Sequence, residues 1–402
     1  MSNFVFVVVG MAAAFLAGLL APRESLPTLE SSASSSDVGV PVRNVTWVAD
    51  APPFTAQQQL TLYRYGKFAY TARVAGQSVA SVIAAARALF GDERIAQLRS
   101  HTGRVLAADN ALRELDDELD RGFLVCLGAD EQFVWPALRV GEAVRVRLRS
   151  SDSDRVVSMH TLSSRPRAFL VPALLSHGEC DELVAIGKST QLDKSKVGAD
   201  VGTGGEYRDV RTSSQTWIGP GSPNDTPTVK RVRERIFDLV KMPLDLGEAL
   251  QLVHYNVSQH YMGHHDYSHI WESKDSPYVQ AGGNRFITIV MYLNDVEAGG
   301  ETMFPFGNTT NRPILDEKGA EQVWVMIDGQ HVYYGNPGCD GRGLVVPPIK
   351  GSALIFYNLL EEHTAFATPD SYTLHAGCDV LKGEKFAAQQ WIRNKRVNGQ
   401  LM

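Results

Sequence analysis

Residues Ala249 to Tyr267 read ALQLVHYNVSQHYMGHHDY and change, part-way along, from a strand-like pattern to a cluster of metal-binding side chains. Ala249–Val257 is rich in apolar and β-branched residues and predicts a strand, with a turn near Ser258–Gln259. Four more runs of this kind follow, separated by turns that contain Gly or Pro: Arg285–Leu293, Gln322–Ile327, Ser352–Tyr357 and Lys385–Ile392. The C-terminal part of the chain is therefore predicted to be a series of short strands.

Two predicted helices precede these strands. Ser176 and Glu179 have the spacing of a capping box and mark the start of one helix, whose apolar face includes Cys180, Leu183, Val184 and Ile186. A second helix begins at Pro227 and carries apolar residues at helical spacing up to Val240. Helices followed by antiparallel strands predict an α+β fold in which a sandwich of sheets is backed by helices.

The N-terminal part of the chain divides into three regions of different composition. Phe4–Ala21 contains no charged residue, so residues 1–21 are expected to be a signal peptide or an uncleaved signal-anchor. Residues 22–40 are Ser-rich and are expected to form a flexible stem. Residues 41–163 are predicted to be a mixed α/β accessory domain without a chemical constellation, with helical periodicity over Ser78–Phe90 and Ala108–Leu119 and a strand pattern over Val144–Arg149.

Sequons and cysteines are compatible with a secretory route. N-x-[ST] triplets occur at four asparagines: Asn44, Asn224, Asn256 and Asn308. Asn256 is expected to remain unmodified because it belongs to a strand-like run beside Tyr255. The cysteines can be paired in disulfides or buried as free thiols: Cys126, Cys180, Cys339 and Cys378. We expect the endoplasmic reticulum or Golgi as the location, with a single N-terminal anchor and a lumenal globular part.

The overall composition excludes some classes of partner. The 402 residues are 44% hydrophobic and 21% charged, which is typical of a globular protein. The formal net charge is −6 and there is no long basic run. Nucleic acid is therefore not expected as the main partner.

His264, Asp266 and His375 are candidate metal ligands. Residues two apart in a strand point to the same side, so His264 and Asp266 can aim at one point while His265 faces away. His375 is the best candidate for the third ligand. The predicted strands Arg285–Leu293 and Ser352–Tyr357 can pair between Asp266 and His375 and bring these distant positions together. Two histidines and one carboxylate can hold one face of Fe(II) and leave the opposite positions open, as in non-haem iron oxygenases. Zinc accepts the same three ligands, so the triad alone leaves the metal open.

Lys385 and Tyr255 indicate a cosubstrate. Lys385 shares one strand face with Ala387, Gln389 and Trp391. A lysine that points into a sheet sandwich needs an anion, because a buried unpaired ammonium is too costly. The distal carboxylate of 2-oxoglutarate would provide this anion, with the Tyr255 hydroxyl as a second donor. A surface charge for Lys385 and ordinary core packing for Tyr255 are the alternatives.

A set of short motifs occurs in order over about residues 164–396. These are Pro166-Arg-Ala-Phe-Leu170, Glu179-Cys-Asp-Glu-Leu183, Arg211-Thr-Ser-Ser214, Tyr261-x-x-His264-x-Asp266, Arg285–Asn294, Gly299-Gly-Glu-Thr-Met-Phe-Pro305, Lys350–Phe356, Leu374-His-Ala-Gly-Cys378, Gly383-Glu-Lys385 and Trp391-Ile392. The set resembles the catalytic domain of prolyl 4-hydroxylases, of both the plant and algal type and the animal alpha subunit. Asp379 and Phe386 depart from the proline and tryptophan common in that family, and residues 307–343 look like a variable insertion.

The resemblance implies a double-stranded β-helix (jelly-roll) core over 164–396, followed by a tail at 397–402. It implies Fe(II) at His264, Asp266 and His375, and O2 and L-ascorbate as further requirements. It also implies a 2-oxoglutarate pocket and a substrate side. The pocket residues would be Lys385, Tyr255 and Thr288, and the substrate-side residues would be Tyr261, Arg285 and Trp391, for which packing and strand-end charge pairing are alternative roles.

The activity implied is that of a procollagen-proline-type 4-dioxygenase. It would hydroxylate peptidyl proline to 4-hydroxyproline and decarboxylate 2-oxoglutarate to succinate and CO2. A Pro-rich substrate in the polyproline II form would lose little entropy on docking to an aromatic-lined groove. The alternatives are a dioxygenase acting on lysyl or another protein side chain, a non-catalytic peptide-binding relative, and a zinc hydrolase.

Overall fold

The computed structural model describes residues 60–64, 73–74, 78–100, 103–107, 123–129, 131–150, 153–195, 211–267, 283–308, 312–315, 321–327, 330–333, 343–360 and 368–396. The chain divides into two compact units, Met1–Asp37 and Val38–Met402, and all described residues belong to the second. Phe4–Ala21, the predicted stem and the predicted tail lie outside the described residues. Among the residues that the structure describes, no helix is both long enough and apolar enough to cross a membrane.

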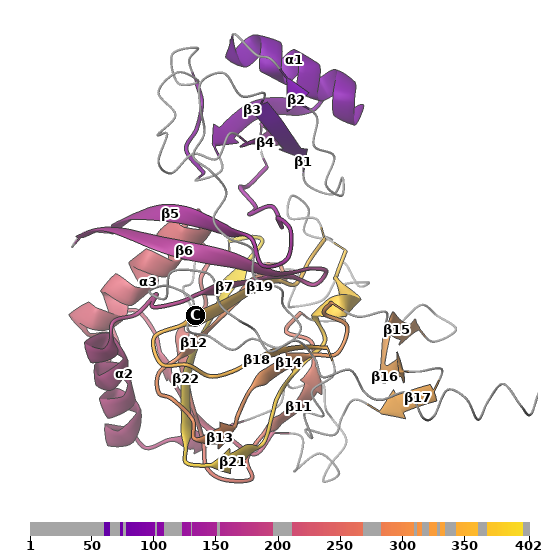
Figure 1. The fold of residues 1–402 in the computed structure, drawn as a ribbon. Coiled ribbons are helices and arrows are strands. Elements are labelled where there is room, and N and C mark those ends of the chain that lie inside the picture. The colour runs from indigo at the N-terminus through magenta and orange to yellow at the C-terminus, as the bar shows by residue number, and fades with distance from the viewer. Residues whose placement is uncertain are drawn as a thin grey trace, which may run out of the picture. The chain divides into compact units, whose positions relative to one another are not determined.

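Nine strands form one large sheet, in the order β5-β6-β7-β19-β12-β22-β10-β9-β8, and neighbouring strands are antiparallel (Figure 1). The central strands are almost entirely buried on both faces, which fits their continuous apolar runs. The bounds are β5 Ala143–Ser150, β6 Ser153–Ser164, β7 Arg167–Val171, β8 Asp193–Lys194, β9 Ser214–Ile218, β10 Leu250–Tyr255, β12 Arg285–Tyr292, β19 Ala353–Tyr357 and β22 Lys385–Arg393.

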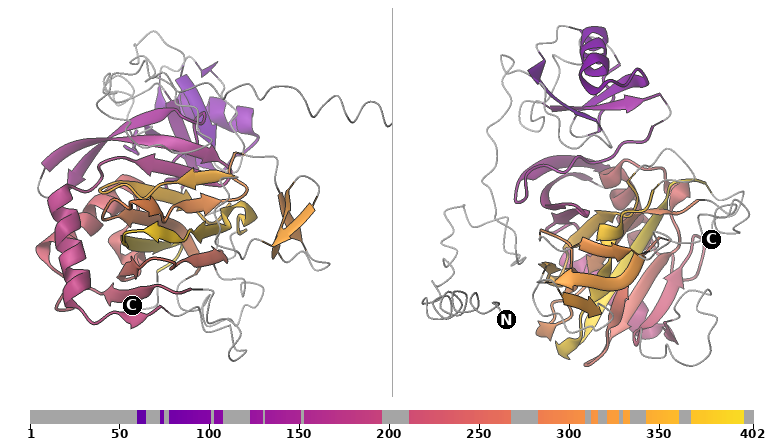
Figure 2. Two further views of the ribbon diagram at one scale, coloured as in Figure 1. Left: turned by 60° about the horizontal axis from the view of Figure 1, so that its bottom comes forward. Right: turned by 90° about the vertical axis from the view of Figure 1, so that its right-hand side faces the viewer.

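A second sheet of four short strands has the order β11-β20-β14-β18 (Figure 2). Its bounds are β11 Tyr261–His264, β14 Thr302–Phe304, β18 Leu344–Val346 and β20 His375–Gly377. One apolar cluster joins the two sheets, because Val290, Leu354 and Phe356 of the large sheet pack with Phe304 and Leu344 of the small one. Along the chain, β10, β12, β19 and β22 of the large sheet alternate with β11, the pair β14 and β18, and β20 of the small sheet. This is the predicted double-stranded β-helix.

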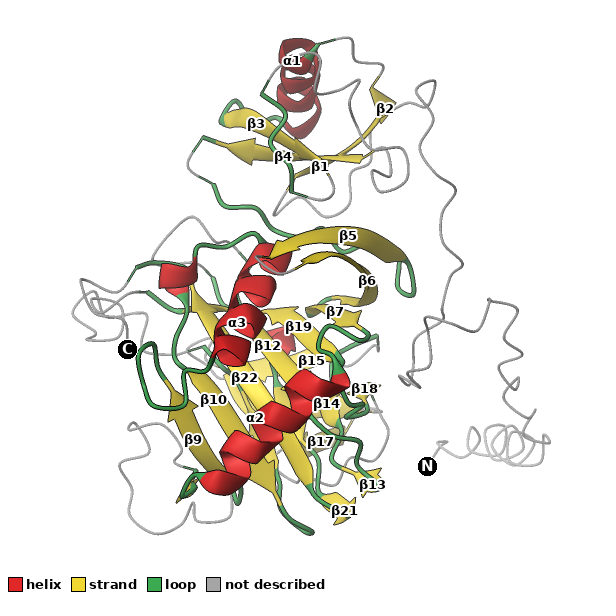
Figure 3. Cartoon of the chain, turned by 90° about the vertical axis from the view of Figure 1, so that its left-hand side faces the viewer, coloured by secondary structure: helices red, strands yellow, loops and turns green. Residues whose placement is uncertain are grey.

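Two helices cover the face of the large sheet that points away from the small sheet: α2 His177–Ser189 and α3 Pro227–Val240 (Figure 3). Ser176 and Glu179 form the predicted capping box, and α3 begins at Pro227 as predicted. Leu183 and Ile236 are buried in the same cluster as Ile289 of β12. Burying each such side chain contributes about 1.5–3 kcal/mol, so the helix layer stabilises the sheet.

A separate four-stranded sheet precedes the jelly roll, in the order β2-β1-β4-β3. β1 and β4 are parallel, the other pairs are antiparallel, and α1 lies between β2 and β3 in sequence. This order, with a hairpin, a helix and two further strands, is a β-grasp topology. The bounds are β1 Leu60–Arg64, β2 Arg73–Val74, α1 Val79–Phe90, β3 Ile95–Ser100 and β4 Phe123–Gly128. The helix predicted over Ser78–Phe90 is confirmed with Ser78 as its N-cap, whereas Ala108–Leu119 lies outside the described residues.

The remaining regular elements are short. β13 Ala298–Gly299 pairs with β21 Val380–Lys382. Three strands form a small antiparallel sheet within the segment 307–343: β15 Arg312–Leu315, β16 Glu321–Ile327 and β17 Gln330–Tyr333. Two 3-10 helices occupy Leu244–Leu246 and Ser371–Thr373.

Two expectations from the sequence differ from the structure. β6 pairs with β7, so the large sheet runs across the boundary expected between residues 163 and 164, and β5 and β6 belong to the jelly-roll sheet. Asn256 does not lie within a strand: β10 ends at Tyr255, and Asn256 is exposed in the following turn, where its carbonyl accepts from the Gln259 amide at 3.0 Å. The turn itself lies where the sequence predicts it.

The cysteines are in two states. Cys126 and Cys180 are buried free thiols, and burial raises the pKa of each above its usual value. Cys378, three residues after His375, is disulfide-bonded. Cys339 lies outside the described residues.

Candidate metal centre

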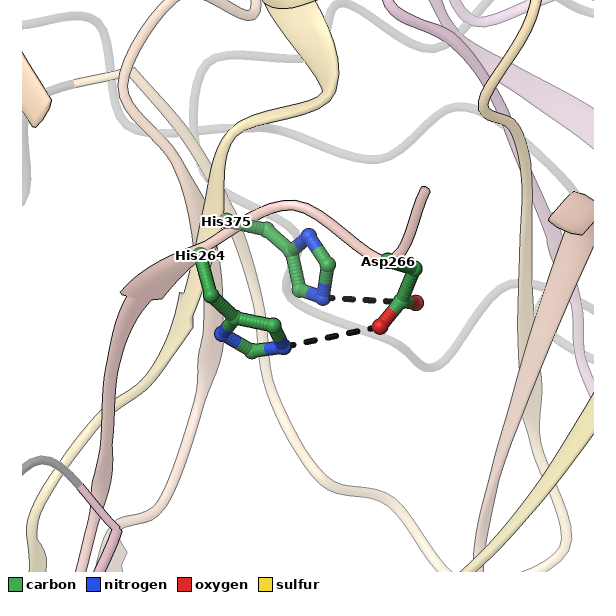
Figure 4. A group of neighbouring side chains, drawn as sticks. All are labelled: His264, Asp266 and His375. Carbon is green, nitrogen blue, oxygen red and sulfur yellow. Dashed lines mark ion pairs between the residues drawn. The ribbon is translucent and has the colours of Figure 1, made fainter. Parts of the chain in front are cut away.

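His264, Asp266 and His375 meet at one point between the two sheets (Figure 4). One ligand atom from each lies within 4.8 Å of the others. The Nε2 atom of His264 is 3.6 Å from Asp266 Oδ1, and Nε2 of His375 is 3.7 Å from Asp266 Oδ2. Among the described residues, His264, Asp266 and His375 form the one cluster of at least three His, Cys, Asp or Glu side chains whose spacing could hold a metal ion.

Strand pairing brings the two histidines together. β11 and β20 are direct neighbours, and His264 and His375 are opposite each other in their register. The two strands predicted between these positions, β12 and β19, do pair with each other, and they lie in the large sheet. Asp266 lies two residues beyond the end of β11, so its carboxylate reaches the site from a bend rather than from the strand. His265 faces away, with Nε2 3.2 Å from the Ser371 carbonyl.

Backbone carbonyls fix both imidazoles in the orientation that a metal requires. His264 Nδ1 is 2.8 Å from the Met262 carbonyl, and His375 Nδ1 is 2.9 Å from the Thr373 carbonyl. A carbonyl oxygen only accepts, so each Nδ1 carries the hydrogen and donates it. Each Nε2 therefore presents a lone pair toward Asp266, as expected of paired metal ligands.

Charge and burial favour metal-binding protonation states. Burial lowers the pKa of His375 to about 4, and the neighbouring His264 acts in the same direction. Burial alone would raise the pKa of Asp266, but the nearby imidazoles of His375 and His264 hold it well below its usual range. At neutral pH the site therefore offers a neutral His375 and a carboxylate. This donor set fits a divalent ion such as Fe(II).

Lys385 lies buried in the same interior, with 4% of its surface exposed. Its Nζ lies 5.2 Å from the centre of the Tyr255 ring and 5.7 Å from that of Tyr292. It forms no hydrogen bond or ion pair with any residue in the described ranges. Burial lowers its pKa to about 8, which the more distant Glu301 carboxylate only partly opposes. A buried ammonium between two aromatic rings is suited to receive an anion.

Tyr255 and Thr288, the other expected cosubstrate residues, have different surroundings. Tyr255 lies opposite Lys385 in the register of β10 and β22, and both are buried. Thr288 donates its hydroxyl hydrogen to Asp266 Oδ2 at 2.7 Å. Thr288 therefore contacts the metal-binding carboxylate directly.

The expected substrate-side residues lie beside the metal centre or at the end of the sheet. The Tyr261 ring stacks on the His264 ring with 3.5 Å between centroids. Arg285 pairs with Glu248 at 2.8 Å and lies 3.9 Å over the Trp391 ring. Charge pairing and packing therefore both occur at these positions.

Two residues that were not singled out as site residues also face this interior. The guanidinium of Arg211 is buried and lies 4.5 Å from the centre of the Tyr261 ring. Tyr292 borders Lys385 and donates to Thr302 Oγ1 at 2.8 Å. Both belong to motifs quoted above, but their direction depends on tertiary pairing: Arg211 bridges Tyr261, and Tyr292 lies in β12, which pairs with β22.

The chain is similar to several known proteins. Residues 250–393 match the 2OG-Fe(II) oxygenase superfamily. The chain is 36% identical over 231 residues to probable prolyl 4-hydroxylase 4 of Arabidopsis thaliana, covering 58% of this chain and 68% of the relative. It is 35% identical to prolyl 4-hydroxylase 2 of the same plant, with the same coverage. Among solved structures, a collagen prolyl hydroxylase from Paramecium bursaria Chlorella virus-1 is 23% identical with a TM-score of 0.35, over 56% of this chain and 94% of that one.

Proposed function

The chain belongs to the prolyl 4-hydroxylase family of 2-oxoglutarate- and Fe(II)-dependent dioxygenases, and on that premise we propose that its metal centre converts peptidyl proline to 4-hydroxyproline. The observation that carries this proposal is the convergence of His264, Asp266 and His375 in an interior that also contains Lys385, which pairs with no carboxylate of the described residues. A hydrolytic zinc site has no need of such a lysine.

Different residues of this chain would bind the metal and the cosubstrate. His264, Asp266 and His375 would hold Fe(II), which when bound supplies the activation of O2 coupled to decarboxylation of 2-oxoglutarate. Lys385 would receive the distal carboxylate of 2-oxoglutarate, and the Tyr255 hydroxyl would act as a second donor. The apolar wall around them excludes water, which strengthens these charge contacts.

The balance of the reaction is simple. One oxygen atom of O2 enters the C4–H bond of proline and gives the hydroxyl group. The other oxygen atom enters succinate as 2-oxoglutarate loses CO2. L-ascorbate would return oxidised iron to the ferrous state.

An exposed tryptophan beside a buried one supports a Pro-rich substrate. Trp217 is 42% exposed, and its ring lies 5.7 Å from that of Trp391, over which Arg285 is positioned. We assign Tyr261, Arg285 and Trp391 to the substrate side. A polyproline II segment packs its rings on such aromatic faces with a small loss of entropy.

The experiment uses the full chain with Fe(II), 2-oxoglutarate, ascorbate and a series of synthetic peptides. We expect Pro-rich peptides to gain one oxygen atom and to release succinate in equal amount, and His375→Ala to abolish both. Hydroxylation of lysine peptides instead would replace the proposed substrate class. Succinate absent with every peptide would contradict a catalytic role.

We further propose a lumenal location in the secretory pathway, with Phe4–Ala21 as the anchor. The disulfide at Cys378 suits an oxidising compartment. Asn256 and Ser258 of one sequon are exposed in a turn, whereas the Asn224 side chain donates to Thr190 Oγ1 at 3.1 Å. Expression in eukaryotic cells should therefore give a glycosidase-sensitive mass that decreases in Asn256→Gln, and an unchanged mass in that variant would contradict modification at this turn.

A further inference from the structure

A chain of two hydrogen bonds connects the metal-binding carboxylate to the large sheet. Thr288 Oγ1 donates to Asp266 Oδ2 at 2.7 Å, and Asn358 Nδ2 donates to Thr288 Oγ1 at 2.8 Å. Thr288 is 1% exposed and Asn358 is fully buried. Water therefore does not compete for these bonds, and each is stronger than it would be at the surface.

We call the hydrogen-bond chain Asn358–Thr288–Asp266 the relay. The chemistry of its three groups fixes the direction of both hydrogen bonds. An ionised carboxylate only accepts hydrogen bonds, so the single hydroxyl hydrogen of Thr288 must point to Asp266. The Thr288 oxygen is then an acceptor toward Asn358, which must present its NH2 group. Because that hydrogen is already used, Thr288 cannot at the same time donate it to 2-oxoglutarate.

Both relay residues are anchored on rigid backbone. Thr288 lies in the middle of β12, opposite Trp391 on one side and Phe356 on the other. Asn358 follows β19 directly; its amide donates to the Phe286 carbonyl, and its carbonyl accepts from the Asp370 amide, both at 2.8 Å. Asp266, in contrast, lies in a bend beyond the end of β11. The relay thus ties a ligand on an irregular segment to the centre of the sheet.

The Asn358 side chain is incompletely satisfied, which indicates a directional role. Its Oδ1 atom is buried and has no hydrogen-bond partner within the described part of the chain. A buried acceptor without a partner costs about 1–3 kcal/mol, so an apolar side chain would serve packing alone better. The donor to Thr288 is the feature that an apolar residue could not supply.

We propose that Thr288 and Asn358 are positioning residues that hold Asp266 so that a single carboxylate oxygen, Oδ1, is presented to the metal. The proposal rests on the proposed metal centre. An octahedral ion held by three protein atoms retains three positions, which a chelating 2-oxo acid and O2 together require. A carboxylate that rotated and bound through both oxygens would occupy one of those positions.

The test measures metal binding rather than turnover. Mn(II), which is not oxidised during the measurement, is titrated into the full chain, and free Mn(II) is followed by electron paramagnetic resonance. Thr288→Val keeps the shape of the side chain and removes the hydroxyl, and we expect an increase of about 10- to 100-fold in the dissociation constant. Thr288→Ser restores a hydroxyl and should return most of the affinity.

Asn358→Leu should weaken Mn(II) binding in the same direction but less. The double variant should be no weaker than Thr288→Val, because Asn358 acts through Thr288. Thr161→Val is the matched control: Thr161 is 1% exposed and its Oγ1 accepts from the Leu138 amide, away from the ligands, so its affinity should equal that of the unchanged chain. Circular dichroism and the thermal midpoint report the fold of every variant.

The outcomes are separable. Unchanged Mn(II) affinity in Thr288→Val, alongside loss of binding in His375→Ala, would overturn the relay and leave the proposed function intact. Unchanged affinity in His375→Ala would overturn the metal centre and the relay together. Weakening in Thr288→Val that is not shared by Asn358→Leu would remove Asn358 from the proposal.

Discussion

Two buried cations, one in the N-terminal β-grasp sheet and one in the jelly roll, show how differently a fold can treat a charge. Arg64 on β1 is enclosed by two carboxylates: it bonds Asp92 Oδ2 at 2.8 Å and pairs with Glu131 in a fork-like contact. Lys385 on β22 is equally buried, and no carboxylate in the described ranges pairs with it. Paired buried charge stabilises a structure, whereas unpaired buried charge indicates a place for a ligand.

The two pKa directions express the same difference. Burial lowers the pKa of Arg64, but hydrogen bonds to Glu131 and Asp92 more than restore it and raise it above its usual value. Burial lowers the pKa of Lys385 to about 8 with little compensation. Four changes test this contrast, from the largest expected effect to the smallest.

Arg64→Met should have the largest effect on stability. It leaves Glu131 and Asp92 buried with less compensation, and breaking a buried pair in this way costs about 3–5 kcal/mol. Denaturant unfolding followed by circular dichroism should show an earlier transition for the N-terminal sheet. Binding of 2-oxoglutarate should be retained, and an unchanged transition would mean that Arg64 is not structurally needed.

Lys385→Met should act in the opposite sense on the ligand-free protein. The pKa of Lys385 is lower in the folded chain than in the unfolded one, so below about pH 8 its charge opposes folding, by up to about 3 kcal/mol. The variant should unfold at a higher temperature but lose the stabilisation that 2-oxoglutarate provides, about 2.7 kcal/mol at a concentration of about 100 times the dissociation constant. Lys382→Met is the control, because Lys382 is 73% exposed and should change neither quantity. A ligand-induced shift that survives in Lys385→Met would place the cosubstrate elsewhere.

The affinity for 2-oxoglutarate should fall as the pH rises through about 8, because Lys385 then loses the charge that the carboxylate needs. At about pH 9.5 the dissociation constant should be about 30-fold higher than at neutral pH. Anaerobic calorimetry across this range measures the effect. Lys385→Arg should flatten the dependence, since arginine stays charged, and a flat profile in the unchanged chain would argue against Lys385 as the anchor.

Asp181→Asn should have the smallest effect. Asp181 pairs with Lys350 at 2.5 Å, but its side chain is 68% exposed. An exposed pair contributes about 0–1 kcal/mol, so the thermal midpoint should move little and 2-oxoglutarate binding should not change. A large loss of stability would show that burial does not explain why the Arg64 pairs contribute more than the Asp181–Lys350 pair.

The site could be predicted further than the domain that precedes it. His264, Asp266, His375 and Lys385 are residue types with distinctive chemistry, and the motifs around them made them candidates. The structure brings the first three together and buries Lys385. The β-grasp sheet had no such signal, because parallel pairing of β1 with β4 depends on contacts about sixty residues apart that leave no local pattern. The expected boundary at residue 163 failed for the same reason: β6 shows a strand pattern but not which strand it pairs with.

The sequence by itself determined which side chains are available for chemistry and where helices and strands begin, because caps, turns and periodicity are local properties. Only the tertiary structure decided which partner each side chain meets. In the folded chain, the Thr288 hydroxyl donates to Asp266 and the Arg285 guanidinium pairs with Glu248. No carboxylate of the described residues pairs with Lys385. The reason is that a hydrogen bond or an ion pair depends on atoms within a few ångströms, and in a jelly roll those atoms come from strands that are distant in the chain.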